Sequence, residues 1–291
     1  MTIAVNPLQA DFVAIVDGVD LTLPMSQAHL LEVQAALDKF GVLIFRGPNL
    51  SEEQQLRFAR NFGALETSGI LGDRKLRVHE KLADVSNLDH DNAVVGPADR
   101  RRMNMLGNQL WHTDSSFKAT PAKYSALHAH AVPPEGGETQ FADMRAAYDA
   151  LPSAMQQRVD GLVVEHSLFT SRAKIGFTDF TDEERARFPT ALQRLVRLHP
   201  ATQRKSLYLA AHASHIDGWP LSDGMMLLLD LMEHATQREF VYTHKWSNGD
   251  LVIWDNRCTM HRGRPFDETW KRDMRRATVV DDGPTIADDA A

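Results

Sequence analysis

The segment Asn108-Gln109-Leu110-Trp111-His112-Thr113-Asp114 contains a His-x-Asp pair, and we predict that it is a strand. Side chains two residues apart on a strand point to the same side, so His112 and Asp114 can bind one ion. A third ligand, His261, follows the apolar run Leu251-Val252-Ile253-Trp254 and the turn after it. Two histidines and one carboxylate leave three positions of an octahedral Fe(II) open for a cosubstrate and oxygen. The pattern therefore predicts the mononuclear iron site of an oxygenase.

The three ligands do not choose their metal. Zinc accepts the same side chains, and a His-x-Asp triplet arises readily by chance in a chain with 13 histidines. A zinc hydrolase and a metal-binding jelly roll without turnover therefore stay open. The single cysteine, Cys258, excludes an internal disulfide and a cysteine-rich zinc cluster.

Composition narrows the class of protein. All-β barrels and sandwiches reach the length of 291 residues as one domain, so we expect a single domain over 1–291 with loop-rich insertions near 66–106 and 171–192. The net charge of −7 argues against nucleic acid or an anionic membrane as the main partner. No apolar run approaches the roughly 20 residues of a membrane span, and the N-terminus lacks the basic and apolar regions of a signal peptide. We expect a cytoplasmic protein.

Hydrophobic periodicity predicts short strands with helices at the start and between them. Expected helices cover Ser26–Phe40, Ser51 to about Phe62, Asp143–Leu151, Ser153–Val159 and Gly224–Ala235, and expected strands include Gly41–Phe45, Glu138–Phe141, Glu239–His244, Asp250–Asp255 and 274–280. From this pattern we predict a mainly β fold with flanking helices, a double-stranded β-helix or jelly roll.

Polar residues on the later strands indicate how two anions are bound beside the metal. Arg272 lies one strand beyond His261, where a guanidinium can pair with the far carboxylate of a dicarboxylate cosubstrate. Thr139 can add a hydroxyl to that carboxylate. Strand alternation puts Arg276 on the same face as Arg272, so we expect it to bind the anionic end of the primary substrate. His215 lies in a segment of small residues, and we include it as a candidate substrate contact.

These motifs occur together in one order, which the chain shares with a known family. His112-x-Asp114, Thr139 after Gly136-Gly137, Trp254-Asp255-Asn256, His261 and Arg272 resemble the taurine dioxygenase/2,4-dichlorophenoxyacetate dioxygenase family of Fe(II)/2-oxoglutarate-dependent oxygenases. The resemblance extends over nearly the whole chain and is strongest to its aryloxyacetate-oxidising members.

The resemblance implies a set of roles. Fe(II) is bound by His112, Asp114 and His261, and 2-oxoglutarate is bound by the metal, Thr139 and Arg272. The acidic group of the substrate meets Arg276, and Asn108 lies near the substrate. The family also implies a homo-oligomer.

The implied reaction consumes O2 and hydroxylates the carbon next to the ether oxygen of an aryloxyacetate such as the herbicide 2,4-dichlorophenoxyacetate. It releases a phenol and glyoxylate, together with succinate and CO2. The alternative is the same chemistry on a sulfonate or another small organic acid.

Overall fold

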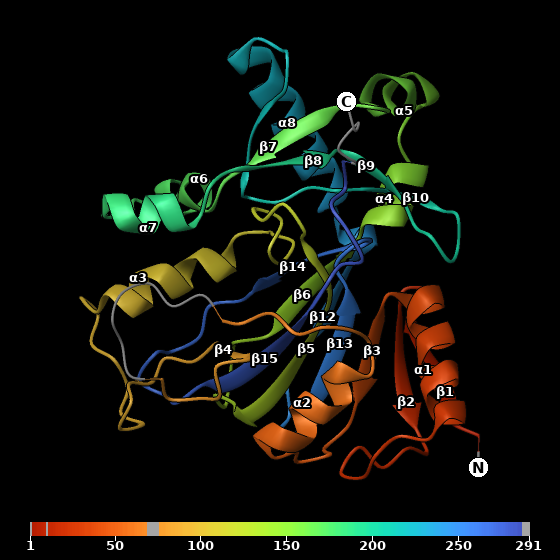
Figure 1. The fold of residues 1–291 in the computed structure, drawn as a ribbon, viewed down its shortest axis with the longest axis vertical. Coiled ribbons are helices and arrows are strands. Elements are labelled where there is room, and N and C mark those ends of the chain that lie inside the picture. The colour runs from red at the N-terminus through yellow and green to blue at the C-terminus, as the bar shows by residue number, and fades with distance from the viewer. Residues whose placement is uncertain (1, 10, 69–75, 287–291) are drawn as a thin grey trace.

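The computed structural model describes residues 2–9, 11–68 and 76–286, and its centre is a large β-sheet (Figure 1). The seven strands of this sheet lie in the order β1 (Ala4–Gln9), β2 (Val13–Asp17), β3 (Val42–Phe45), β13 (Leu251–Asp255), β5 (Ala122–Ala131), β15 (Asp273–Val280) and β4 (Leu82–Asp84). All pairs are antiparallel except β2 with β3. Strands distant in sequence thereby become neighbours.

A second sheet packs on one face of the first. Its strands lie in the order β12 (Val241–His244), β6 (Thr139–Asp143) and β14 (Thr259–Gly263). Residues of both sheets share one apolar core, in which the rings of Phe141 on β6 and Trp254 on β13 lie 5.4 Å apart. Two packed, mainly antiparallel sheets with these crossovers form the predicted jelly roll.

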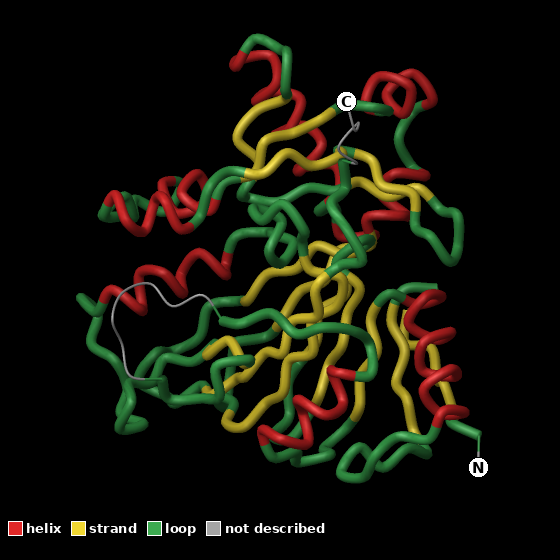
Figure 2. Tube along the Cα trace, viewed as in Figure 1, coloured by secondary structure: helices red, strands yellow, loops and turns green. Residues whose placement is uncertain are grey.

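Two helices cover the other face of the large sheet (Figures 1 and 2). They are α1 (Gln27–Phe40), capped by Ser26, and α2 (Glu52–Arg60), which begins with a capping box of Ser51 and Gln54. Both helices were predicted, the first from apolar residues at helical spacing and the second from the capping-box spacing of Ser51 and Gln54.

The chain between β6 and β12 forms a separate layer, seen above the two sheets in Figure 1. It comprises α4 (Met144–Asp149), α5 (Ser153–Val159), β7 (Val163–His166), α6 (Leu168–Ala173), α7 (Asp182–Arg187), β8 (Ala191–Arg194), β9 (Val196–Leu198), β10 (Lys205–Leu207), β11 (Ala213–Ile216), α8 (Leu221–Ala235) and the 3₁₀ helix η2 (Arg238–Phe240). Its strands form the small sheets β11-β7-β8 and β10-β9. An apolar core under α8, with Leu207, Leu227 and Leu231, attaches the layer to β6 and β14. In the part of the chain described, no helix has the length and apolarity needed to cross a membrane.

The structure corrects the predicted strand over Asn108–Asp114. Residues 107–109 form a 3₁₀ helix, η1 (Gly107–Gln109), which continues α3 (Arg100–Leu106), and only His112 makes a bridge, with His261. Helix α3 escaped prediction within the loop-rich segment 66–106 because it buries no side chain and so has no apolar periodicity. Its start is a local cap, in which Asp99 accepts a hydrogen bond from the backbone N–H of Arg101 at 2.7 Å. Residues 69–75 of that segment lie outside the described residues.

Arg145 of α4 joins the outer layer to the sheets through the end of α1. Its buried guanidinium donates to three backbone carbonyl oxygens, those of Lys39 and Phe40 at 3.0 Å each and that of Asp11 at 2.9 Å. Asp143 supplies the compensating carboxylate at 3.1 Å. The arginine therefore satisfies carbonyls at the C-terminus of α1 that have no partner within the helix.

We expect Arg145→Met to lower the free energy of unfolding by about 3 kcal/mol, because it leaves Asp143 buried without its counter-charge. Urea denaturation measures this loss. The matched control is Arg204→Met, which removes a half-exposed pair with Asp149 and should cost at most about 1 kcal/mol. Equal losses in the two variants would contradict this account of Arg145.

Candidate active site

His112, Asp114 and His261 converge at the edge where the segment after η1 meets β14. One ligand atom from each lies within 4.8 Å of the other two, and all three side chains are buried. Asp114 Oδ1 is 3.8 Å from His112 Nε2, and Asp114 Oδ2 is 3.6 Å from His261 Nε2. Thr113 points away and donates to the carbonyl oxygen of Leu209. The predicted alternation therefore holds although the segment is not a strand, and His261 lies on β14, the strand that follows the turn after β13.

The three side chains have the protonation states that a metal requires. Burial lowers the pKa of His112 and holds that of His261 well below its ordinary value, so both rings are neutral. The Nδ1 atom of His112 lies 2.7 Å from the carbonyl oxygen of Leu110, which places the ring N–H on Nδ1. The lone pair of Nε2 is then free to bind a metal. Burial alone would raise the pKa of Asp114, but the charge of Arg276 and the hydrogen bond from Ser125 lower it to about 2. Two neutral imidazoles and one carboxylate, without thiolates, are a donor set suited to Fe(II).

Neighbours of Asp114 hold its carboxylate in place. Arg276 on β15 donates to Oδ1, and Ser125 on β5 donates to Oδ2 at 2.7 Å. Asn256 connects these contacts, since its amide donates to Ser125 Oγ at 3.0 Å and its oxygen accepts from the backbone N–H of Asp114 at 3.2 Å. Fixing a ligand before the metal arrives reduces the cost of ordering it on binding.

A first cavity opens beside the triad and ends at Arg272. It is lined by His112 and His261 on one side and by Thr139 and Arg272 on the other, with Leu127, Trp254 and Phe266 as apolar walls. The guanidinium of Arg272 donates to the carbonyl oxygens of Val85 and Gly137, at 3.3 and 3.4 Å, and burial lowers the pKa of Arg272 to about 10. Within residues 2–9, 11–68 and 76–286 it has no carboxylate partner. A buried guanidinium without an acid is a site for an anion.

The Gly136-Gly137 turn and Thr139 complete this end of the cavity. Gly136 has φ +76° and lies so close to the next segment that a Cβ there would be 2.6 Å from the carbonyl oxygen of Pro265, which only glycine permits. The hydroxyl of Thr139 accepts from Trp246 Nε1 at 3.0 Å and keeps its own O–H free to donate. Thr139 and Arg272 therefore present donors to the same space, as the sequence predicted.

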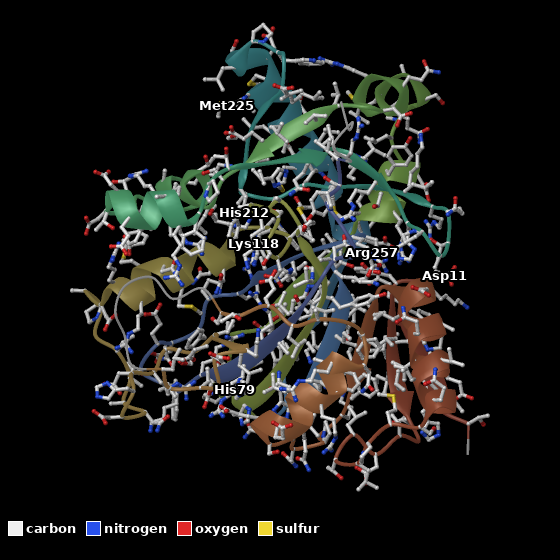
Figure 3. The ribbon with its side chains drawn as sticks, viewed as in Figure 1. Asp11, His79, Lys118, His212, Met225 and Arg257 are labelled. Atoms are coloured by element: carbon white, nitrogen blue, oxygen red, sulfur yellow. The ribbon has the colours of Figure 1, made fainter. Side chains whose placement is uncertain are left out.

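A second cavity adjoins the triad and is lined by residues of both the sheets and the outer layer. Its wall includes His112, Asp114 and Arg276 together with Phe117, Leu168, Arg172, Phe188 and His212. Figure 3 shows two of its residues, Lys118 and His212, in this region between the layers. Asn108, His112 and Arg276 line both cavities, so the two spaces meet at the metal ligands.

The candidate substrate contacts are divided by the structure. Arg276 and Asn108 face the cavities as expected. His215 does not: it lies on β11 beside Glu165, 3.7 Å away, with its Nδ1 3.1 Å from Ser214 Oγ, and it lines neither cavity. The small residues around it mark the turn into β11, where His212 rather than His215 reaches the site. Sequence reasoning also missed Ser125 and Arg172. Ser125 is a polar residue within a buried strand, which is a weak signal, and Arg172 had none.

Asp38, His199 and Asp255 also converge, but as an ion-pair cluster. Arg257 donates to Asp255 at 2.6 Å and lies 3.9 Å from Asp38, and His199 Nε2 is 3.0 Å from Asp255. A guanidinium already compensates these carboxylates, so we assign this cluster to the core.

Comparison with known proteins agrees with this geometry. The family model described as Taurine catabolism dioxygenase TauD, TfdA family matches residues 4–278. The alpha-ketoglutarate-dependent 2,4-dichlorophenoxyacetate dioxygenase of Cupriavidus pinatubonensis is 47% identical over 284 residues, covering 97% of this chain and 99% of the relative. The (S)-phenoxypropionate/alpha-ketoglutarate-dioxygenase of Sphingobium herbicidovorans is 38% identical, covering 96% and 95%. The crystal structure of AAD-2 in complex with Mn(II) and N-oxalylglycine superposes with a TM-score of 0.91 at 50% identity, covering 98% of this chain and 99% of that one.

We expect Ser125→Ala to weaken metal binding by roughly tenfold to a hundredfold, because the Asp114 carboxylate loses a donor that orients it. The change is measured by titrating the metal-free protein with Mn(II) and following the electron paramagnetic resonance signal of the free ion. Ser206→Ala is the control, since Ser206 is equally buried and donates at 2.8 Å to the carbonyl oxygen of Arg257, away from the triad. Unchanged affinity in Ser125→Ala would show that Arg276 suffices to hold the carboxylate.

Proposed function

The chain belongs to the taurine catabolism dioxygenase TauD, TfdA family and is a 2-oxoglutarate-dependent dioxygenase, and we propose that its primary substrate is an aryloxyacetate such as 2,4-dichlorophenoxyacetate. The proposal includes Fe(II) on His112, Asp114 and His261. It also places the protein in the cytoplasm as a homo-oligomer that binds neither nucleic acid nor membrane.

The observation that carries the cosubstrate site is the buried Arg272 at the end of a cavity that His112 and His261 also line. A dicarboxylate that reaches the metal with one end can pair with Arg272 at the other, and Thr139 can donate to the same carboxylate. N-oxalylglycine, which is bound with Mn(II) in the related AAD-2 structure, has the skeleton of 2-oxoglutarate with an amide nitrogen in place of one methylene. Neither a zinc hydrolase nor a non-catalytic jelly roll needs such a clamp.

The second cavity supports the choice of an aromatic acid. Phe117 and Phe188 form an edge-to-face pair with ring centroids 6.2 Å apart, and Leu168 adds an apolar surface. Arg276 lies at the metal end of this wall, where we place the substrate carboxylate, and Asn108 lies beside it. Relatives at 47% and 38% identity act on phenoxy acids by name, which favours an aryloxy acid over a sulfonate.

In the proposed reaction the bound iron supplies the activation of O2, coupled to the conversion of 2-oxoglutarate to succinate and CO2. One oxygen atom enters succinate, and the other hydroxylates the CH2 between the ether oxygen and the carboxylate. The resulting hemiacetal breaks its bond to the ether oxygen and gives the phenol and glyoxylate. The protein holds both acids by their carboxylates, so that the CH2 faces the metal, and the buried apolar walls keep water from the site.

We expect oxygen uptake that requires Fe(II), 2-oxoglutarate and 2,4-dichlorophenoxyacetate together, with phenol and succinate in equal amounts. An oxygen electrode and chromatography of both products measure this. His112→Ala should abolish the uptake, because the triad loses a ligand. Succinate without phenol would reject the aryloxyacetate and keep the dioxygenase, and phenol formed without 2-oxoglutarate would favour hydrolysis.

Substitution of Arg272, directly before β15, and of Arg276, on β15, should raise the KM of different substrates. We expect Arg272→Met to raise the KM for 2-oxoglutarate by more than about tenfold, and Arg276→Met to do the same for the aryl acid, since each loses a charged hydrogen-bond pair. Steady-state kinetics at saturating Fe(II) distinguish the two. An unchanged KM for the aryl acid in Arg276→Met would mean that Arg276 serves Asp114 alone.

A further inference from the structure

A second buried arginine faces the substrate cavity. Arg172 lies in the last turn of the short helix α6 (Leu168–Ala173) of the outer layer. Its side chain lines the second cavity with His112, Asp114 and His212. It is only 7% exposed. No motif in the sequence singled it out, and the reaction as described above gives it no role.

The contacts of Arg172 leave its charge uncompensated. Nε donates to Asn104 Oδ1 at 2.8 Å and Nη1 donates to Ser171 Oγ at 3.1 Å, and both acceptors are neutral. Nη2 has no partner among the residues that the structure describes, and no carboxylate of those residues pairs with the guanidinium. By contrast, Lys118 and Arg276 of the same wall have acids, Glu66 at 2.7 Å and Asp114.

Burial of such a charge is costly, and here it lowers the pKa of Arg172 to about 10. The guanidinium remains charged at neutral pH all the same. A buried, charged group without a counter-ion in a cavity beside a metal site indicates an anionic ligand.

Gly107 makes room for this guanidinium. A Cβ placed on Gly107 would lie 2.3 Å from Arg172 Nη1 and 2.5 Å from Cζ. The backbone of Gly107 has φ −58° and ψ −23°, which any residue adopts, so the turn itself does not require glycine. What requires it is the approach of Arg172 to the segment that carries Asn108 and His112.

We propose that Arg172 binds the carboxylate of the aryl acid in the second cavity, as a second cation beside Arg276. This inference rests on the proposed function for the identity of the acid. Arg276 divides its donors between Asp114 and the substrate, whereas the free edge of Arg172 has no competing acid. A planar guanidinium can take a carboxylate with two parallel hydrogen bonds. The outer layer thereby contributes a charge, as well as apolar surface, to substrate recognition.

Binding of 2,4-dichlorophenoxyacetate to protein loaded with Mn(II) and N-oxalylglycine tests the proposal by isothermal titration calorimetry, without turnover. We expect Arg172→Gln to weaken binding by about tenfold or more, and Arg172→Lys to recover part of the loss. Gly107→Ala should weaken it by several-fold, because it displaces the guanidinium while keeping the charge and a permitted backbone. In all three variants the affinity for N-oxalylglycine should stay within about twofold of wild type.

Lys174→Gln is the matched control. Lys174 is the next cation along the chain, but its ammonium donates to the carbonyl oxygens of Ala211 and Ala213, and it does not line the cavity. We expect this variant to bind the aryl acid as wild type does. A loss equal to that of Arg172→Gln would assign the effect to the stability of this region and overturn the proposal.

The neutral amide, 2,4-dichlorophenoxyacetamide, separates recognition of charge from packing. Wild type and Arg172→Gln should bind the amide equally, because it lacks the anion. Equal weakening of acid and amide, or unchanged binding of the acid, would overturn the role of Arg172 while leaving the proposed function intact. A wild-type protein that binds no aryloxy acid would overturn the proposed function and this inference with it.

Discussion

Two hydrogen bonds between His112 and His261 hold the candidate active site together. The backbone N–H of each residue donates to the carbonyl oxygen of the other, at 2.9 and 2.8 Å. This single bridge attaches the segment after η1 to β14, so two ligands from one segment meet a third from a strand far along the chain. This bridge fixes the backbones of the two histidines rather than their side chains. The side chains of His112 and Asp114 lie on one side of their segment and that of Thr113 on the other, so His112 and Asp114 both reach His261. The jelly roll matters for function because its crossovers bring β14, β5 and β15 to the same place.

The three arginines of the site differ in whether a carboxylate compensates their charge. The Asp114 carboxylate would resist ionisation when buried, and Arg276 offsets that cost, which prepares a charged ligand before any metal is present. Arg272 and Arg172 lack such partners among the described residues, and they line different cavities. Burial of each of these two cations without a carboxylate is costly. The proposed binding of an anion in each cavity would offset that cost.

Much of this arrangement was predictable from sequence because it depends on local spacing. The capped helices α1 and α2, the apolar strands β3 and β13, and the ligand pair in Trp111-His112-Thr113-Asp114 all carry their signal in a few neighbouring residues. The strand predicted for Asn108–Asp114 was wrong because α3, a helix none of whose side chains is fully buried, continues into η1. His215 was placed at the site on composition alone, whereas the contacts of β11 turn it towards Glu165. Arg172 could not be predicted as a candidate anion-binding residue, because that inference depends on its neighbours in space and on a glycine of another element.

The layered construction separates catalysis from specificity. Metal ligands, Thr139, Arg272 and Arg276 all lie on the two sheets or on segments that border them, and their positions are coupled to the main core. Leu168, Arg172, Phe188 and His212 come from the layer between β6 and β12, whose apolar core also includes Met260, next to His261. A change in α6 or in the loop before β8 alters the wall of the second cavity directly. The two cavities have five lining residues in common, which are Val85, Met105, Asn108, His112 and Arg276, so most of the wall of each cavity is built from different residues.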